Sequence, residues 1–331
     1  MNVAVVGAGS WGTALAIQVA RNGQRTRLWD HDAERADRMQ LERKNSRYLP
    51  SSEFPDALEV RGDLAWALED ADVCIEAVPS VGLREVIPRM AAHLAPKTVV
   101  ICATKGIEPD SLCTMDQLLH EGLPAGQRLV TLGGPSFAKE VAIGMPTAVV
   151  VASHDPEANH IAAEALHGGF FRVYDTDDVV GVELGAALKN VIAVACGVSD
   201  GAGLGTNARA ALITRGLTEM SRIATRLGAN PLTMMGLAGL GDLVLTCTGD
   251  LSRNRRVGLG LGAGKTLKQV LGELGQVAEG VVTAHSAWQL AQREGVDMPI
   301  TEQVYRMLYE DKPVGEVLRD LAGRSRRTER G

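Results

Sequence analysis

Short apolar runs alternate with helical patterns through the first 180 residues, and this alternation constrains the fold more than any other feature. Strands are expected at Val3–Val6, Thr26–Trp29, Val73–Ala77, Thr98–Cys102, Leu129–Leu132, Ala148–Val151 and Phe171–Tyr174. Several are continuous Val/Ile runs, which are typical of strands buried on both faces of a parallel sheet that helices cover. The sequence therefore predicts an α/β domain with a doubly wound sheet.

Strand patterns stop near residue 180, and the rest of the chain is helical. Helices are expected at Val182–Val198, Asn207–Leu227, Pro231–Leu240, Arg255–Leu261, Leu267–Leu274, Thr283–Arg293, Thr301–Glu310 and Val314–Leu321. Because the two halves differ in this way, the sequence predicts two domains. We assign residues 1–178 to the doubly wound α/β domain, residues 179–325 to an all-α domain and residues 326–331 to a tail.

Charge and cysteine content exclude several classes of protein. The net charge of −6 argues against a general nucleic-acid binder, which needs a basic surface. The five cysteines include no C-x-x-C pair, so a zinc ribbon or a thioredoxin-type centre is not expected, and no metal site is predicted. Their odd number and wide spacing favour free thiols and a cytoplasmic location. We recognise neither a signal peptide nor an apolar stretch of about 18 residues, so no membrane span is expected.

The first motif is G-A-G-S-W-G, with glycines at Gly7, Gly9 and Gly12. It follows the strand Val3–Val6 and opens a helix, which is the context that a dinucleotide-binding fingerprint requires. Gly7 would make the tight turn, Gly9 would let the backbone approach a pyrophosphate, and Gly12 would allow close helix–sheet packing. Asp30 ends the next strand, where an acid can accept hydrogen bonds from the adenosine ribose. A glycine-rich turn without a ligand is the alternative.

The second motif, A-L-K-N, places Lys189 in a largely apolar helix. Burial disfavours the ammonium form and lowers the pKa of a lysine, so Lys189 would be able to exchange a proton near neutral pH. Asn190 offers an amide donor and acceptor beside it. The alternative is an ordinary helix lysine that extends its amine to solvent.

A third cluster contains Asp242, Ser252, Arg253 and Asn254, in the runs G-L-G-D and S-R-N-R-R. Arg253 can form forked hydrogen bonds with phosphate oxygens, and Ser252 and Asn254 add donors at an expected helix N-terminus. Asp242 lies in an apolar, glycine-rich turn, from which a carboxylate can orient a lysine or accept a hydroxyl. The alternatives are helix N-caps at Asp242 or Ser252 and a solvated basic face at Arg253–Arg256.

Two loops complete the candidate site. Thr104-Lys105-Gly106 follows one expected strand, and G-G-P-S-F-A, with Gly134, Ser136 and Ala138, follows another. Ligands of open α/β sheets bind beyond the carboxyl ends of the strands, where both loops lie. Lys105 adds a point charge suited to a phosphate or to the carboxamide region of a cofactor, although a solvated loop lysine is the alternative.

Six motifs, in this order, closely resemble the bacterial NAD-dependent glycerol-3-phosphate dehydrogenase family. They are G-A-G-S-W-G-T-A, A-T-K-G-I, G-G-P-S-F-A-K-E, A-L-K-N, G-L-G-T-N-A-R-A-A-L-I-T-R-G-L-T-E-M and G-L-A-G-L-G-D-L-V-L-T-C. The resemblance runs from residue 2 to about residue 320. It implies a Rossmann domain followed by an α-helical domain, with the active site between them. It also implies reversible reduction of dihydroxyacetone phosphate to sn-glycerol 3-phosphate, the backbone precursor of glycerophospholipids, with NAD or NADP.

The same resemblance implies roles for individual residues. Lys189 matches the proton acceptor of the family and also contacts substrate. The other substrate contacts match Lys105, Gly134, Ser136, Asp242, Ser252, Arg253 and Asn254. The cofactor contacts match Ser10, Trp11, His31, Lys105, Ala138, Arg253, Val277 and Glu279, beside the fingerprint glycines.

Two other functions compete with this interpretation. One is another enzyme of the same architecture, such as a β-hydroxyacid dehydrogenase, which also uses a helix lysine. The S-R-N-R-R run with the K-G-I and G-P-S-F-A loops favours a phosphate-bearing ketone instead. The other is a non-catalytic dinucleotide sensor, which would keep the glycines but would not need Lys189 or Arg253.

The choice of cofactor is not resolved by the sequence. Asp30 favours NAD, because an acid at this position bonds the ribose 2′-hydroxyl and repels a 2′-phosphate. His31 follows Asp30, at a position that the family uses near the adenosine end of the cofactor, so NADP binding is also expected. We therefore expect both cofactors to work, with NADH used at least as well as NADPH at pH 8. The sequence does not determine the oligomeric state, and a homodimer is the default assembly because C2 dimers are the commonest oligomers.

Overall fold

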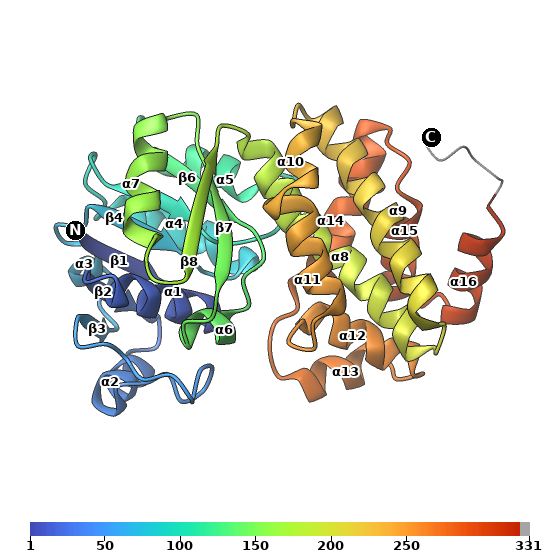
Figure 1. The fold of residues 1–331 in the computed structure, drawn as a ribbon, viewed down its shortest axis with the longest axis horizontal. Coiled ribbons are helices and arrows are strands. Elements are labelled where there is room, and N and C mark those ends of the chain that lie inside the picture. The colour runs from blue at the N-terminus through green and yellow to red at the C-terminus, as the bar shows by residue number, and fades with distance from the viewer. Residues whose placement is uncertain (325–331) are drawn as a thin grey trace.

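An eight-stranded sheet forms the first half of the molecule (Figure 1). This computed structural model describes residues 1–324, so the predicted tail, residues 326–331, lies outside the described residues. The strands are β1 (Asn2–Val6), β2 (Arg25–Trp29), β3 (Leu58–Arg61), β4 (Val73–Glu76), β5 (Val99–Cys102), β6 (Arg128–Gly133), β7 (Thr147–Ala152) and β8 (Phe171–Thr176). Their order in space is β3-β2-β1-β4-β5-β6-β7-β8. Each expected strand is present, with its ends shifted by no more than two residues.

Helices cover both faces of this sheet, as the continuous apolar runs predicted. They are α1 (Ser10–Arg21), α2 (Ala33–Glu42), α3 (Leu64–Leu68), α4 (Ser80–Ala91), α5 (Met115–Gly122), α6 (Ala138–Ala142) and α7 (Pro156–Leu166). In β1, Val3 and Val5 belong to the core on one face, under α1 and α7. Ala4 and Val6 belong to the core on the other face, under α3, α4 and α5. A strand buried on both sides needs no polar alternation.

The sheet departs from the prediction at two strands. The strand β3 was not expected, because only Leu58 and Val60 of its four residues are buried and it pairs only with β2 at the edge of the sheet. The strand β7 runs antiparallel to β6, while β7 and β8 are parallel to each other. The chain returns from β6 to β7 through α6 alone, so the doubly wound sheet is mixed rather than wholly parallel.

The second half of the molecule is built around α8 (Val179–Gly201). The other helices are α9 (Gly205–Arg226), α10 (Pro231–Met235), α11 (Asp242–Thr248), α12 (Arg253–Gly262), α13 (Leu267–Leu274), α14 (Glu279–Glu294), α15 (Pro299–Tyr309) and α16 (Val314–Ala322). By length and composition α8 is apolar enough to cross a membrane, but 94% of its most apolar window is buried inside the protein. Burial to that extent is what a core helix shows, and the described residues hold no second helix of this kind.

The single helix expected at Pro231–Leu240 is broken. The helix α10 ends at Met235, one π-helical turn, η1 (Leu237–Gly241), follows, and α11 begins at Asp242. A Cβ atom on Gly239 would overlap the backbone of Met234, so the π-helical turn packs against the end of α10 at a glycine. The glycine-rich run G-L-A-G-L-G is therefore an extended residue, Gly236, followed by a π-helical turn, and Asp242 starts a helix that we did not predict.

The helices α8 and α12 approach each other through four glycines. A Cβ atom on Gly197 of α8 would overlap the Arg255 carbonyl oxygen of α12, and one on Gly258 would overlap the Val194 carbonyl oxygen. Gly201 and Gly262 meet opposing carbonyl oxygens one helical turn further along. Residues four apart share one face of a helix, so each helix presents a glycine-lined groove to the other. This packing holds the N-terminus of α12 against the middle of α8.

The glycine contact predicts opposite effects for two glycine-to-alanine substitutions. Gly258→Ala should destabilise the protein by about 1–3 kcal/mol, because neither helix backbone can move without loss of packing. Gly272→Ala on α13, where a Cβ atom meets nothing within 4 Å, should stabilise it by about 0.4–1 kcal/mol. Urea unfolding followed by circular dichroism measures both. Equal stability of the two variants would contradict the packing described here.

Candidate active site

A cleft of about 300 Å³ lies between the sheet and the helical half of the chain. Its floor comes from the loops after β1, β4, β5 and β6, each of which contributes residues from just beyond the end of its strand. Its other wall comes from α8, α11, α12, α14 and the loop that precedes α14. The carboxyl ends of the strands in an open α/β sheet are where such proteins bind ligands, so the cleft is in the expected position.

Two lysines share one carboxylate at this cleft. Lys189 Nζ contacts Asp242 Oδ1, and Lys105 Nζ donates to Asp242 Oδ2 at 3.0 Å. The side chain of Asp242 is 1% exposed and that of Lys189 is 7% exposed. Burial lowers the pKa of Lys189 to about 7, with Asp242 opposing the shift and Lys105 adding to it. The arrangement leaves a lysine that can hold or release a proton near neutral pH.

Asp242 owes its position to the start of α11. It is the first residue of that helix and directly follows the π-helical turn, where its own backbone N–H is bonded to the Leu237 carbonyl oxygen. Thr246, one turn later, donates its hydroxyl hydrogen to the Asp242 carbonyl oxygen at 2.6 Å and also lines the cleft. Thr246 was not among the predicted site residues, although its spacing of four from Asp242 on a helix would have indicated a shared face.

The N-terminus of α12 is tied to α8 and α14 by Asn254. Its Nδ2 donates to Asn190 Oδ1 at 2.8 Å, and its Oδ1 accepts from Gly280 N at 2.9 Å. A Cβ atom on Gly280 would lie 2.6 Å from the Asn190 carbonyl oxygen, so this junction also requires a glycine. Asn254 therefore joins three helices beside Lys189.

The basic run at the start of α12 points in two directions. Arg253 and Arg256 line the cleft, and among the described residues Arg253 forms no ion pair. Arg255 turns away, donating to Asp200 Oδ2 at 2.7 Å and to Asp250 at 2.9 Å. Ser252 is the N-cap of the helix, because its Oγ accepts from Arg255 N at 3.2 Å. The N-cap interpretation of Ser252 is thus correct, while a purely solvated basic face is not what the structure shows.

The glycine fingerprint has the geometry that its spacing predicted. Gly7 has a φ of +112°, and a Cβ atom there would lie 2.7 Å from the Ala77 carbonyl oxygen. A Cβ atom on Gly12 would overlap the Gly7 carbonyl oxygen, whereas Gly9 faces open space. Trp11 Nε1 is buried in the cleft wall without a hydrogen-bond partner. An open backbone approach beside a buried, unpartnered donor suits a dinucleotide.

Most of the predicted site residues meet in this cleft. Those that line it are Gly9, Ser10, Trp11, Lys105, Ser136, Ala138, Lys189, Ser252, Arg253, Asn254, Val277 and Glu279. Gly7, Gly12 and Gly134 are not in the lining, but they allow the tight backbone turns beside it, and Gly134 has a φ of +105°. Asp242 is also outside the lining, where it pairs with Lys105 and Lys189. His31 is not part of the lining, and its side chain is 72% exposed at the end of β2.

Two acidic residues bound this region, of which Glu279 was predicted as a cofactor contact and Glu76 was not predicted. Glu279 accepts from Ser80 Oγ at 2.5 Å and so connects α14 with α4 across the cleft. Glu76 ends β4, where it accepts from Val78 N at 2.6 Å and from Thr104 Oγ1 at 2.9 Å. Burial raises the pKa of Glu76 to about 7. The sequence could have indicated Glu76, because it is an acidic residue at the end of the otherwise apolar run V-C-I-E.

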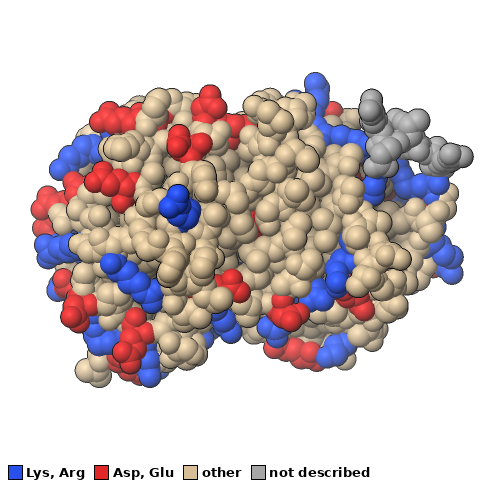
Figure 2. All heavy atoms as spheres, in the orientation of Figure 1, with Lys and Arg blue, Asp and Glu red and all other residues tan. Residues whose placement is uncertain are grey.

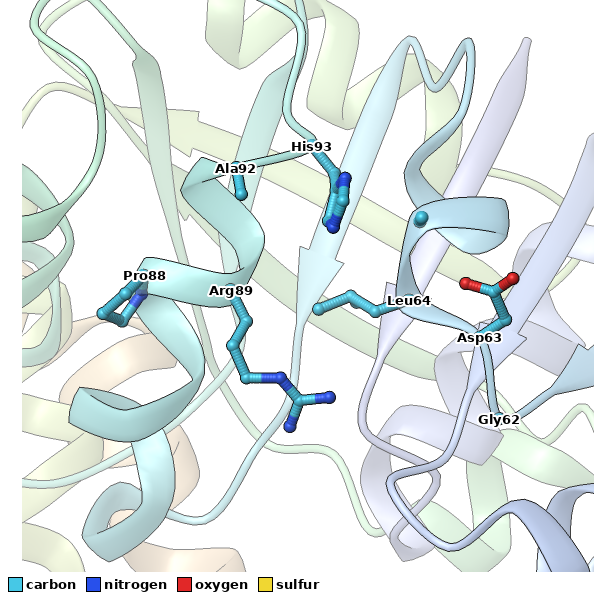
Figure 3. A pocket seen from close by; sticks show the side chains of 8 residues that line it. Gly62, Asp63, Leu64, Pro88, Arg89, Ala92 and His93 are labelled. Carbon is cyan, nitrogen blue, oxygen red and sulfur yellow. The ribbon is translucent and has the colours of Figure 1, made fainter.

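A second hollow, between α3 and α4, offers less chemistry (Figure 3). Its lining includes Asp63, Arg89 and His93. Asp63 caps α3 by accepting from Trp66 N at 3.2 Å, and the Arg89 guanidinium lies over the Trp29 ring at 5.1 Å from its centroid. Because both charged groups already have partners, we place the candidate active site in the cleft.

Comparisons with known proteins point to one family. The NAD-dependent glycerol-3-phosphate dehydrogenase N-terminus matches residues 2–159, and the C-terminus of the same family matches residues 178–319. The glycerol-3-phosphate dehydrogenase (NAD(P)+) of Geobacter metallireducens is 52% identical over 99% of both chains. That of Anaeromyxobacter sp. strain K is 51% identical over 99% of this chain and 100% of its own.

Solved structures agree with these matches. The crystal structure of glycerol-3-phosphate dehydrogenase from Coxiella burnetii superposes with a TM-score of 0.93 at 46% identity, covering 97% of this chain and 98% of that one. A D-mandelate dehydrogenase, at 14% identity and a TM-score of 0.62 over 96% of this chain and 100% of its own, shares the fold alone.

The shared carboxylate predicts an electrostatic effect of Asp242→Asn. The pKa of Lys189 should fall further, because Asp242 favours its charged form and Lys105 disfavours it. An NMR titration of ¹³C-methylated lysines, with Lys189→Arg to assign the signal, measures this midpoint. Asp250→Asn is the control, since Asp250 is 97% exposed and, among the described residues, pairs with Arg255 rather than with Lys189. A midpoint unaffected by Asp242→Asn would show that the carboxylate does not control Lys189.

Proposed function

The chain belongs to the NAD-dependent glycerol-3-phosphate dehydrogenase family, and from this premise we propose how its cleft performs the reaction. The reaction is the reversible reduction of dihydroxyacetone phosphate to sn-glycerol 3-phosphate with NAD(P)H, which supplies the backbone of glycerophospholipids. The observation that carries the proposal is the buried Lys189–Asp242 pair, which shares one cleft with Arg253 and with the fingerprint turn.

Lys189 moves the proton in this proposal. The bound nicotinamide supplies or accepts the hydride. As an ammonium, Lys189 gives its proton to the ketone oxygen during reduction, and as an amine it takes that proton back during oxidation. Asp242 holds Nζ in place, and Lys105 opposes the charged form, which makes the proton easier to give.

Arg253 anchors the substrate phosphate. It faces the cleft at the N-terminus of α12, where free backbone N–H groups also favour an anion, and Arg256 adds a second positive charge. A fixed phosphate sets the distance to the carbonyl group, so the ketone is held against Lys189. Ser136 and Asn254 lie in the same lining and complete the proposed contacts.

The cofactor would lie along the fingerprint turn. Gly9 leaves the backbone open to the pyrophosphate, and the first turn of α1 offers N–H groups that no side chain caps. Ser10, Trp11 and Ala138 line this end of the cleft, and Val277 and Glu279 face it from the helical half.

The alternatives fit the molecule less well. A β-hydroxyacid dehydrogenase shares the fold, but the family match extends over both halves of the chain. A dinucleotide sensor has no use for a buried ammonium–carboxylate pair, which is expensive to keep in a protein interior.

The division into domains, the location in the cell and the oligomeric state are also proposals. We propose that residues 1–178 bind the cofactor and residues 179–325 hold the substrate, which the start of α8 at Val179 supports. A cytoplasmic location is supported by five free cysteines. A homodimer is supported by the exposed side chains of Leu232, Met235 and Val244 on α10 and α11, in a region of the front face that carries few charges (Figure 2).

The role of Lys189 predicts both a loss and a pH dependence. Lys189→Met should lower kcat by about 10²–10⁴-fold, the range for a general acid–base group. In the wild type, the rate of reduction should fall as the pH rises through about 7, because the amine has no proton to give, and the rate of oxidation should rise. Lys139→Met, which removes an exposed lysine of the same cleft, is the control. A Lys189→Met enzyme that keeps most of its kcat would show that Lys189 is not the general acid–base group.

The phosphate anchor predicts a substrate-dependent effect. Arg253→Ala should raise the KM for dihydroxyacetone phosphate roughly 10- to 150-fold, as expected when a hydrogen bond to a charged group is lost. Unphosphorylated dihydroxyacetone should react almost as well with the variant as with the wild type. Steady-state kinetics with both ketones measure the difference, and equal losses would mean that Arg253 serves the cofactor or the fold.

A further inference from the structure

The acid that ends β2 is not available to a ligand. Gly7 N donates to the Trp29 carbonyl oxygen at 3.1 Å, which places Asp30 directly beside the fingerprint turn. An acid at this position ordinarily accepts from the ribose 2′-hydroxyl of NAD. In this chain the Asp30 side chain is 0% exposed. Its Oδ2 accepts from Arg35 Nε at 2.6 Å, and its Oδ1 accepts from Arg35 Nη2 and from Asp32 N.

The outer surface of this corner presents a guanidinium and an imidazole instead. Arg35 lies in the first turn of α2, and its side chain is 18% exposed above the buried carboxylate. His31 is 72% exposed, with Nδ1 3.4 Å from Arg35 Nη2. Asp32, the second acid, accepts from Arg35 N as the N-cap of α2, and its Oδ2 lies 3.8 Å from Arg35 Nη1.

The charges of the corner therefore balance. Two carboxylates, Asp30 and Asp32, face Arg35, and Arg38 on the same helix acts electrostatically on Asp32. Taken alone, the motif D-H-D at residues 30–32 would suggest a negative surface, but Arg35 and Arg38 offset the charges of its two carboxylates. An anion that approaches Arg35 and His31 meets a guanidinium, which is always charged and has several donors, rather than a bare carboxylate.

We propose that Arg35, held in place by Asp30, is the cofactor-specificity residue of this chain and receives the 2′-phosphate of NADPH together with His31. Asp30 is then a positioning residue that orients the guanidinium, not a ribose acceptor. This inference rests on the proposed function, because it concerns the cofactor of that reaction. It replaces the preference for NADH that Asp30 suggested in the sequence.

The test compares two fragments of the cofactors, 2′,5′-ADP and 5′-AMP, which differ only by the 2′-phosphate. Isothermal titration calorimetry of the whole protein with 2′,5′-ADP and with 5′-AMP gives a ratio of dissociation constants. We expect 2′,5′-ADP to bind about 10- to 150-fold more tightly, the effect of hydrogen bonds to a charged group. Arg35→Gln should bring the ratio close to one and leave the affinity for 5′-AMP unchanged. Arg38→Gln, on the same helix, should preserve the wild-type ratio.

A second variant guards against misfolding. Loss of Arg35 alone leaves Asp30 buried without its partner, whereas Asp30→Asn with Arg35→Gln keeps a neutral, hydrogen-bonding pair. This double variant should fold with a melting temperature near that of the wild type and should also lose the preference for 2′,5′-ADP. In kinetics it should raise the KM for NADPH and change kcat little.

The outcomes separate this proposal from the proposed function. If both fragments bind equally to the wild type, or if the double variant keeps the preference, the assignment of Arg35 is wrong while dinucleotide binding stands. If neither fragment binds, the proposed cofactor site itself fails, and the assignment of Arg35 fails with it.

Discussion

The close approach of α8 and α12 is the contact on which the rest of the site depends. Gly197 and Gly258 let the two backbones meet without side chains between them. That approach places Asn254 Nδ2 within 2.8 Å of Asn190 Oδ1, one residue from Lys189. The helix that offers Arg253 to the cleft is thus positioned by the helix that carries the proposed proton donor. A wider helix spacing would separate the phosphate anchor from the reacting carbonyl group.

A buried lysine needs a partner, and the sharing of Asp242 between two lysines determines how strongly it is paired. One carboxylate facing one ammonium would hold the proton firmly, because the attraction favours the charged form. Burial is the main cause of the lowered pKa of Lys189, and the second cation, Lys105, lowers that pKa further. The break between α10 and α11 contributes directly, since α11 then begins at Asp242, whose carboxylate contacts Lys189 of α8.

The corner at the end of β2 shows why a motif alone can suggest the wrong chemistry. Asp30 occupies the position of a ribose acceptor, yet both of its oxygens are satisfied by donors of its own chain. A carboxylate that is buried and paired no longer repels an anion at the surface, because its charge is balanced by the guanidinium above it. The function of the position is thus set by its neighbour, Arg35.

Local patterns determined most of the architecture. The apolar runs identified seven of the strands, and the change near residue 180 separated the sheet from the helices, because both follow from the periodicity of neighbouring side chains. The fingerprint glycines and the apolar neighbours of Lys189 could also be recognised from the sequence alone. The tertiary structure alone decided that β7 turns antiparallel, that Lys105 meets Asp242 from 137 residues away, and that Arg35 covers Asp30. These contacts depend on the direction of side chains after packing, which no local period encodes.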